Sequence, residues 1–309
     1  MDIIRQEYLA QLRMFKDKQL IKVVTGIRRC GKSTLLQQFR NELASTGVEQ
    51  NCIIFINFED YAFKNLRTAD LFYEYIQSKI VQGKRMYLFF DEIQRVHNFQ
   101  EVVDSLYIQS GIDLYITGSN SQILSGELAT LLSGRYVEIK MQPFSFCEFV
   151  EATHTEDNLA TAYRMYLEQS SFPYALELRH NQAALDDYLE SIYNTILVKD
   201  VISRKRIVDI SMLQSVTDFV FDNIGLELSS KKIADTMTSH GRKIDPRMVE
   251  QYLASLTDVF VVYKAKRYNI KGKEYLKSLE KYYVCDIALR SALLGKKAMD
   301  VGHILENIV

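Results

Sequence analysis

Residues 26–33, GIRRCGKS, constrain the fold more than any other part of the sequence. They fit the pattern G-x-x-x-x-G-K-[ST] and lie between an apolar run, LIKVVTG, and a helical pattern, STLLQQFRNELASTG. The two glycines allow a tight turn whose backbone N–H groups face a phosphate chain, and the helix start adds partial positive charge. Three cations, Arg28, Arg29 and Lys32, lie within five residues and need an anion among them. The pattern predicts a strand–loop–helix unit that binds a triphosphate; an ordinary cation-rich turn is the alternative.

Each position of this loop has an expected task. Lys32 is expected to reach the β- and γ-phosphates, and Ser33 to place its hydroxyl on Mg²⁺. Arg28 and Arg29 lie in the variable part of the loop, and the sequence leaves open whether they face phosphates or a neighbouring domain. The residues expected to contact the nucleotide are Gly26, Ile27, Arg28, Arg29, Cys30, Gly31, Lys32, Ser33 and Thr34.

Apolar runs alternate with amphipathic patterns as far as residue 142. This alternation predicts a parallel five-stranded sheet with flanking helices, which is an α/β fold of the P-loop NTPase type. Strands are expected at 20–26, 51–60, 85–92, 112–120 and 134–142, and helices at 1–16, 33–47, 68–80 and 99–111.

Two acids follow the third predicted strand, MYLFF. An acid at the mouth of a parallel strand can hold the water shell of a metal, so Asp91 is expected on the metal side. Glu92 is expected to polarise an attacking water, and this second carboxylate is the main sign of hydrolysis rather than binding alone. Ser119 or Asn120, after the fourth strand, is expected near the γ-phosphate. Polar residues at strand ends are also explained by solvation alone.

The pattern changes after residue 143. Helices are predicted at 144–153, 158–170 and 184–204 without intervening strands, then at 212–225, 229–241 and 245–258, before a β-ribbon at 259–278. Three helices followed by a ribbon is the order of a winged helix. The predicted organisation is an ATPase core at 1–143, a helical lid at 144–208, a winged helix at 209–285 and the start of a truncated C-terminal segment at 286–309. The apolar face of this last segment is expected to have nothing after it in the chain to bury against.

Composition excludes several classes of protein. The net charge is -1 and the four cysteines are scattered, which argues against a polycation, a zinc site or a disulfide framework and favours a cytoplasmic location. No signal peptide and no apolar run of about 18 residues are found, so no membrane association is expected. Residues 229–278 nevertheless carry eleven lysines and arginines against five acids, so a non-specific DNA contact through the winged helix is one expectation and a solvated face the other.

These motifs together resemble the AAA+ superfamily of ATPases. The strings LIKVVTGIRRCGKSTLL, INFED, YLFFDEIQ, YITGSNS, LSGRYVEIKMQPFSFCEF and SFPYAL resemble a prokaryotic group that has an AAA domain, a winged helix and a nuclease-like C-terminal domain. The resemblance covers essentially the whole chain. SFPYAL departs from the Gly-x-Pro pattern of related ATPases, because Ser171 stands where they have glycine.

The resemblance implies further roles. Glu92 corresponds to the Walker B glutamate, Asn120 to the sensor residue, and Asn57 to a polar switch that pulls the glutamate out of line. Arg135 corresponds to an arginine finger that completes the site of a neighbouring subunit, so a homo-oligomer is implied; a structural arginine paired with a nearby acid is the alternative. The implied activity is Mg²⁺-dependent hydrolysis of ATP. The competing hypothesis is a nucleotide-gated DNA-binding or adaptor switch with little turnover.

Overall fold

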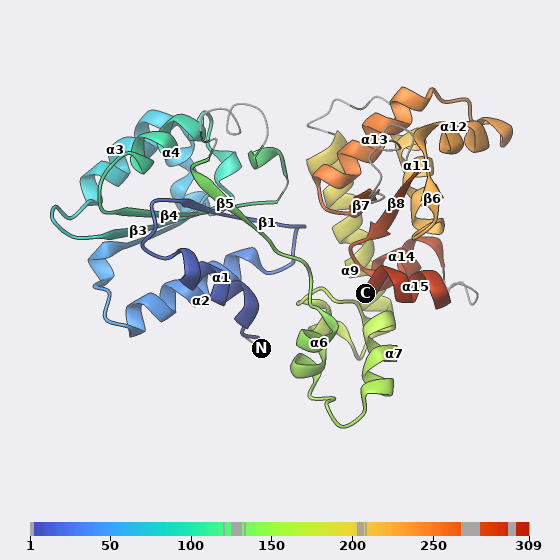
Figure 1. Ribbon diagram of the computed structural model, residues 1–309, viewed down its shortest axis with the longest axis horizontal. Coiled ribbons are helices and arrows are strands. Elements are labelled where there is room, and N and C mark those ends of the chain that lie inside the picture. Colours follow the sequence, from blue (N-terminus) through green and yellow to red (C-terminus); the bar gives the residue numbers. More distant parts are fainter. Residues whose placement is uncertain are drawn as a thin grey trace, which may run out of the picture. The chain divides into compact units, whose positions relative to one another are not determined.

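A computed structural model describes residues 3–119, 121–124, 132, 134–202, 207, 209–266, 279–295 and 301–308. The chain divides into two compact units (Figure 1). The first comprises Met1–Gly26 and Cys30–Gln142, and the second comprises Ile27–Arg29 and Pro143–Val309. Each unit is described by itself.

The first unit is an α/β layer structure, as predicted from the alternating pattern. Its five strands are all parallel and follow the order β2-β3-β4-β1-β5. The strands are β1 (Ile21–Thr25), β2 (Ile53–Asn57), β3 (Met86–Asp91), β4 (Ile112–Gly118) and β5 (Tyr136–Lys140). The α-helices are α1 (Gln6–Phe15), α2 (Lys32–Ser45), α3 (Ala69–Lys79) and α4 (Phe99–Tyr107), with short 3-10 helices at Gln50–Cys52, Tyr61–Arg67, Ile93–Arg95 and Ser121–Leu124.

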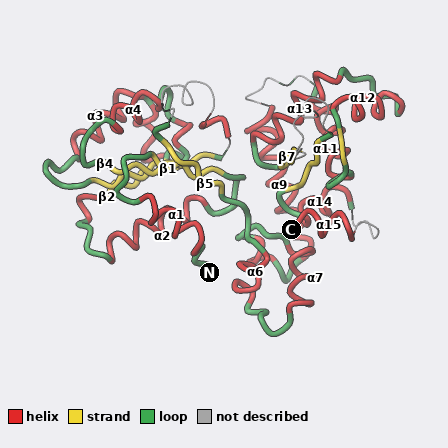
Figure 2. Tube along the Cα trace, in the orientation of Figure 1, coloured by secondary structure: helices red, strands yellow, loops and turns green. Residues whose placement is uncertain are grey.

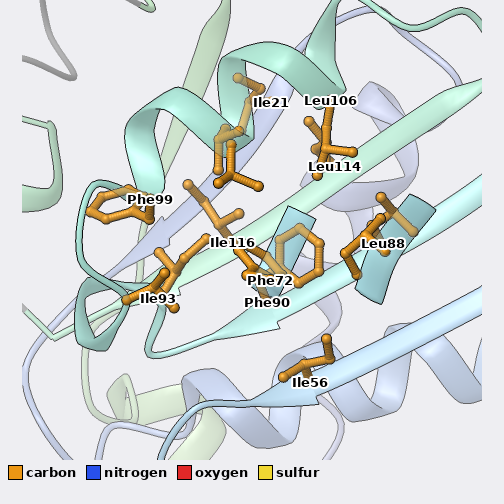
Figure 3. Packing of buried hydrophobic residues seen from close by; sticks show 14 of the residues in the cluster. Ile21, Ile56, Phe72, Leu88, Phe90, Ile93, Phe99, Leu106, Leu114 and Ile116 are labelled. Atoms are coloured by element: carbon orange, nitrogen blue, oxygen red, sulfur yellow. The ribbon is translucent and has the colours of Figure 1, made fainter. Parts of the chain in front are cut away.

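Helices cover both faces of this sheet. Figure 1 shows α1 and α2 on one face and α3 and α4 on the other. All six residues of β3 are buried, because successive side chains of a strand point to opposite faces and both faces are covered. Leu88 and Phe90 pack with Phe72 of α3 (Figure 3), whereas Phe89 stacks on Tyr115 of β4 on the other side. The double-sided core explains why the strands are almost wholly apolar.

The register of the strands brings three carboxyl ends to one edge of the sheet. Thr25 of β1 lies opposite Gly118 of β4, and Phe90 of β3 lies opposite Ile116. Residues that follow β1, β3 and β4 therefore meet at this edge, where open α/β sheets bind their ligands.

The second unit is mainly helical (Figure 2), with one small sheet. Its sheet is antiparallel with the order β6-β8-β7. Ser171 donates from its backbone N–H and its hydroxyl to Asp286 Oδ2, at 2.7 and 2.6 Å. The serine in SFPYAL thus has a structural task that glycine could not perform. The elements are α6 (Phe146–Thr153), α7 (Leu159–Gln169), α8 (Ala175–Leu178), α9 (Gln182–Thr195), a π-helix (Ile196–Ile202), α11 (Ile210–Asp222), β6 (Glu227–Leu228), α12 (Ser230–Ser239), α13 (Pro246–Asp258), β7 (Val262–Lys266), β8 (Glu280–Val284), α14 (Ile287–Leu294) and α15 (Val301–Ile308).

One expectation for this unit was wrong in its bounds. The strand that pairs with β7 is β8, which begins beyond the ribbon expected at 259–278. The C-terminal amphipathic helix, α15, contacts β8, because Glu306 accepts hydrogen bonds from Lys281 and Tyr283 at 2.6 and 2.7 Å. Asn307 also bonds both backbone groups of Val284. Among the described residues, no helix has the length and apolar character needed to cross a bilayer.

Candidate nucleotide-binding site

The loop between β1 and α2 has the backbone that its sequence predicts. Gly26 and Gly31 adopt φ angles of 149° and 104°, a region that favours glycine, and Gly31 is the N-cap of α2. Lys32 is only 5% exposed, and its Nζ donates to the carbonyl of Gly26 at 2.9 Å. Arg29 has a positive φ of 67°, which is costly for a residue with a side chain and is characteristic of functional loops. The lysine thus lies across the mouth of the loop, where the β- and γ-phosphates are expected.

The first glycine has no room for a side chain. A Cβ atom at Gly26 would lie 2.1 Å from the carbonyl oxygen of Met141, in the segment that leaves β5. Real Cβ atoms do not approach backbone oxygens so closely. The start of the loop is therefore packed directly on the exit of β5.

Thr117 of β4 fixes the two acids. Its hydroxyl donates to Asp91 Oδ1 at 2.5 Å and accepts the backbone N–H of Glu92 at 2.9 Å. All three residues are buried, with exposures of 0% for Thr117 and Asp91 and 7% for Glu92. One hydroxyl therefore sets the position of the first carboxylate and the turn that carries the second.

The side chain of Glu92 is held from its other end. Glu92 has φ 54° and ψ 45°, a left-handed conformation that turns the chain sharply after β3. Gln94 donates to Glu92 Oε2 at 2.5 Å and to Ser119 Oγ at 3.4 Å. Ser119 is thereby linked to Glu92 through the side chain of Gln94.

Asp91 and Ser33 fit a Mg²⁺ ion. Burial raises the pKa of Asp91, while hydrogen bonds from Thr117 and Ser33 and the charge of Lys32 act in the opposite direction. Asp91 Oδ2 is buried and has no hydrogen-bond partner among the described residues, so this oxygen is left for another ligand. The described residues contain no cluster of three His, Cys, Asp or Glu. Mg²⁺ does not need one, since it is usually held by one or two carboxylates, waters and substrate phosphates.

Residues Ile27–Arg29 group with the second unit, and there Arg28 has an acidic partner. Its guanidinium forms a two-pronged ion pair with Asp200 in the π-helix, and the Asp200 side chain is fully buried. In this structure the guanidinium of Arg28 therefore pairs with a carboxylate of the second unit.

Other predicted site residues lie elsewhere. Asn57 Oδ1 accepts the N–H of Glu59 at 2.8 Å, a local turn contact. Arg135 immediately precedes β5 and so lies at the amino ends of the strands. The five residues of β5 span about 16 Å, which separates Arg135 from the carboxyl ends where the phosphate loop begins. Its side chain pairs with Asp104 of α4. It also lies over the ring of Tyr107, at 5.4 Å. A role for Arg135 at the phosphates of its own chain is therefore incompatible with the fold. Asn120 lies outside the described residues.

Thr117 and Gln94 were missed in the sequence. Both stand inside motifs that attracted attention for other residues, YITGSNS and DEIQ. A signal for Thr117 existed, because the parallel pairing of β3 and β4 places it next to Asp91, but that pairing is known only once the strand order is known.

The fold and the loop define a P-loop nucleotide-binding protein, and comparisons with known proteins agree. Residues 18–150 match the family model of an AAA domain, AAA_14, and residues 160–300 match a domain of unknown function, DUF8612. An uncharacterised protein of Haemophilus influenzae is 38% identical over 309 residues, covering 99% of this chain and 77% of its own length. This chain belongs to the same family as the Haemophilus influenzae protein, within the AAA+ superfamily of P-loop ATPases.

One further sequence relative and one similar solved structure were found. An uncharacterised protein of Methanocaldococcus jannaschii is 29% identical over 299 residues, which cover 94% of this chain and 65% of that protein. The Walker-type ATPase PABY2304 of Pyrococcus abyssi superposes with a TM-score of 0.62 at 18% identity, covering 94% of this chain and 95% of that chain. The latter likeness supports the fold alone.

Proposed function

We propose that this chain binds ATP with Mg²⁺ at the loop 26–34 and hydrolyses the bond to the γ-phosphate. The observation that carries the proposal is the arrangement of Asp91 and Glu92 by Thr117, with Asp91 Oδ2 left for a ligand. A site for binding alone would need the loop and one acid. The second buried carboxylate, held by Gln94, suits the orientation of a water.

Each group then has one task. Lys32 and the N–H groups of the loop neutralise charge on the phosphates. Ser33 and Asp91 would hold Mg²⁺, which when bound adds positive charge beside the β- and γ-oxygens. Glu92 orients water for attack on the γ-phosphorus, and it needs its charge to do so. The family relationship supports this assignment, as does the match of residues 18–150 to an AAA domain.

The test compares the purified parent with Glu92→Gln and Lys32→Ala in a steady-state ATPase assay with Mg²⁺. Glu92→Gln should keep ATP affinity and lose turnover by ~10²-fold or more, because the amide keeps the shape but not the charge. Lys32→Ala should lose affinity itself. Glu101→Gln, an exposed acid on α4, is the matched control. Turnover by Glu92→Gln at the parent rate would contradict hydrolysis by this site.

A second candidate function is a nucleotide-gated switch that contacts DNA. We propose it on one observation: Lys231, Lys232, Lys243 and Arg247, on and between α12 and α13, are all exposed. Cations on one module favour a non-specific phosphate contact, whose affinity falls steeply with salt. Fluorescence anisotropy with a duplex, at two salt concentrations and with or without ATP, tests it. Equal anisotropy for the parent and a Lys231→Gln/Lys232→Gln variant would contradict this function.

We also propose that a winged-helix module at 209–285 transmits the nucleotide state, that Arg135 completes the site of a neighbouring subunit in a homo-oligomer, and that the protein is cytoplasmic.

A further inference from the structure

A buried cation immediately before helix α1 contacts the phosphate loop from outside its motif. Arg5, immediately before α1, is 3% exposed. Its Nη1 donates to the carbonyl of Cys30 at 3.3 Å, and its Nη2 donates to the carbonyl of Gln142 at 3.1 Å. One guanidinium thus joins the loop to the end of the segment that follows β5.

Tyr8, one turn further along α1, completes this arrangement. The guanidinium of Arg5 lies 4.8 Å from the centroid of the Tyr8 ring, and the Tyr8 hydroxyl accepts the N–H of Gln142 at 3.2 Å. Both backbone polar groups of Gln142 are therefore held, the carbonyl by Arg5 and the N–H by Tyr8. Gln38 of α2 donates to the carbonyl of Ile3 at 2.8 Å, which fixes the start of the same segment.

The contact with Cys30 has a direct consequence for the loop. In a planar trans peptide, the C=O and the following N–H point in opposite directions. Because Arg5 binds the carbonyl of Cys30, the N–H of Gly31 is directed away from Arg5, and a loop N–H that is free of this contact can bind a phosphate oxygen. The same guanidinium places a fixed positive charge behind the loop.

We propose that Arg5, supported by Tyr8, is a positioning residue for nucleotide binding, which orients the Cys30–Gly31 peptide toward the phosphates. This inference rests on the proposed binding of ATP at the loop. It adds a residue from a segment that the sequence motif does not include. Since the effect is on the phosphate cradle, it applies to any polyphosphate, with or without a base.

The experiment measures Kd for Mg²⁺-ATP and for inorganic tripolyphosphate with the full chain. Arg5→Met should raise both Kd values by ~10-fold or more, since hydrogen bonds from a charged donor are lost. Arg5→Lys keeps the charge but cannot bridge two carbonyls as a guanidinium does, so it should recover part of the affinity. In turnover, KM should rise with Kd while kcat changes little, because the contact is equal in ground and transition states.

Arg13→Gln is the matched control. Arg13 lies on the same helix and forms an exposed ion pair with Glu42, at 2.6 and 2.8 Å, away from the loop. Its loss should leave both Kd values unchanged. If Arg5→Met does not fold, Arg5→Lys and Tyr8→Phe carry the test, and unchanged affinity in both would overturn the proposal.

Three outcomes separate the inference from the proposed function. A parent that binds neither ligand overturns ATP binding and the inference with it. A parent that binds, with an Arg5→Met variant that binds equally well, overturns the inference alone. A loss for ATP but not for tripolyphosphate also overturns it, because Arg5 would then act on the base and not on the phosphate cradle.

Discussion

The hydroxyl of Thr117 donates to Asp91 Oδ1 at 2.5 Å and at the same time accepts the backbone N–H of Glu92. A residue that belongs to neither the phosphate loop nor the acidic pair thereby links the carboxylate of Asp91 to the turn that bears Glu92. Under the proposed function, this hydroxyl holds the two acids in their relative positions.

Thr117→Val should remove the hydrogen-bonded link between Asp91 and Glu92. Valine keeps the shape of threonine but leaves the Glu92 N–H without its acceptor in a buried site. We expect turnover to fall by ~10-fold or more with a smaller loss of ATP affinity. Thr117→Ser, which keeps the hydroxyl, should restore most of the rate in the same assay. Equal rates for valine and serine would show that the hydroxyl is dispensable.

Gly26→Ala should disrupt the loop. The new Cβ would lie 2.1 Å from the carbonyl of Met141, so the loop or the exit of β5 must move. We expect ATP affinity to fall by more than ~10-fold, together with a loss of roughly 1–3 kcal/mol in the free energy of unfolding. Gly47→Ala separates strain from contact, because Gly47 also has a positive φ, 96°, but no atom beyond its chain neighbours lies within 4 Å of its Cβ position. Gly47→Ala should lower the free energy of unfolding and leave the ATP affinity unchanged. A similar loss of ATP affinity in Gly26→Ala and Gly47→Ala would contradict this interpretation.

A buried ion pair links β1 and β4 near the amino ends of these strands. Lys22 of β1 pairs with Asp113 of β4, both fully buried, and the Tyr115 hydroxyl and the Asp17 N–H each donate to Asp113 Oδ2 at 2.9 Å. Burial lowers the pKa of Lys22. Lys22→Met leaves the carboxylate without its cation and should reduce the free energy of unfolding by ~3–5 kcal/mol.

The double variant Lys22→Met/Asp113→Asn supplies the comparison. The amide oxygen of asparagine still accepts from Tyr115 and Asp17, and no charge remains buried. Its free energy of unfolding, from urea titration, should be higher than that of Lys22→Met. A double variant as unstable as the single one would show that the buried charge is not the cause.

Asp200→Asn tests the ion pair of the loop arginine. We expect the carboxylate of Asp200 to compete with phosphate for the guanidinium of Arg28, so its neutralisation should raise ATP affinity, by about threefold to tenfold. Asp187→Asn, at an exposed acid of α9, controls for the general change of charge. Equal affinities for both variants, measured by titration at one ionic strength, would mean that the pair has no influence on binding.

Arg135 is tested by mixing variants. Arg135→Ala keeps Glu92 and Glu92→Gln keeps Arg135, so an interface between them rebuilds one complete site if the arginine acts across subunits. We expect partial recovery of ATPase activity in the mixture. Asp104→Asn, which removes the ion-pair partner but leaves the arginine, should stay active. Inactive mixtures with confirmed assembly would leave Arg135 as a structural residue.

The sequence predicted the sheet well because its strands are short apolar runs between strong helix and turn signals. LIKVVTG and MYLFFDE show this most clearly, since both faces of β1 and β3 are covered. EKYYV, which forms β8, mixes charged and aromatic residues and gave no such signal. Its half-buried pattern reflects partners that only the fold supplies.

The site was predictable as far as its motifs extend. Lys32, Ser33, Asp91 and Glu92 come from local patterns, and the structure brings them to one edge of the sheet. Contacts between remote residues could not be predicted, such as those of Arg5 with Cys30 and Gln142, which lie 25 and 137 positions away. Local sequence patterns predict neither the register of parallel strands nor which residues become buried partners.

The left-handed backbone conformation of Glu92 reduces the stability of the folded state, whereas the proposed ATPase activity needs the glutamate side chain. A glutamate in this conformation costs about 1–2 kcal/mol, and asparagine tolerates it better. A population of variants selected only for survival on heating would therefore be expected to replace this residue, and under the proposed function it would lose the charge that orients water. Glutamate at position 92 thus lowers the stability of the folded state, and the turnover proposed here would be the reason to keep it.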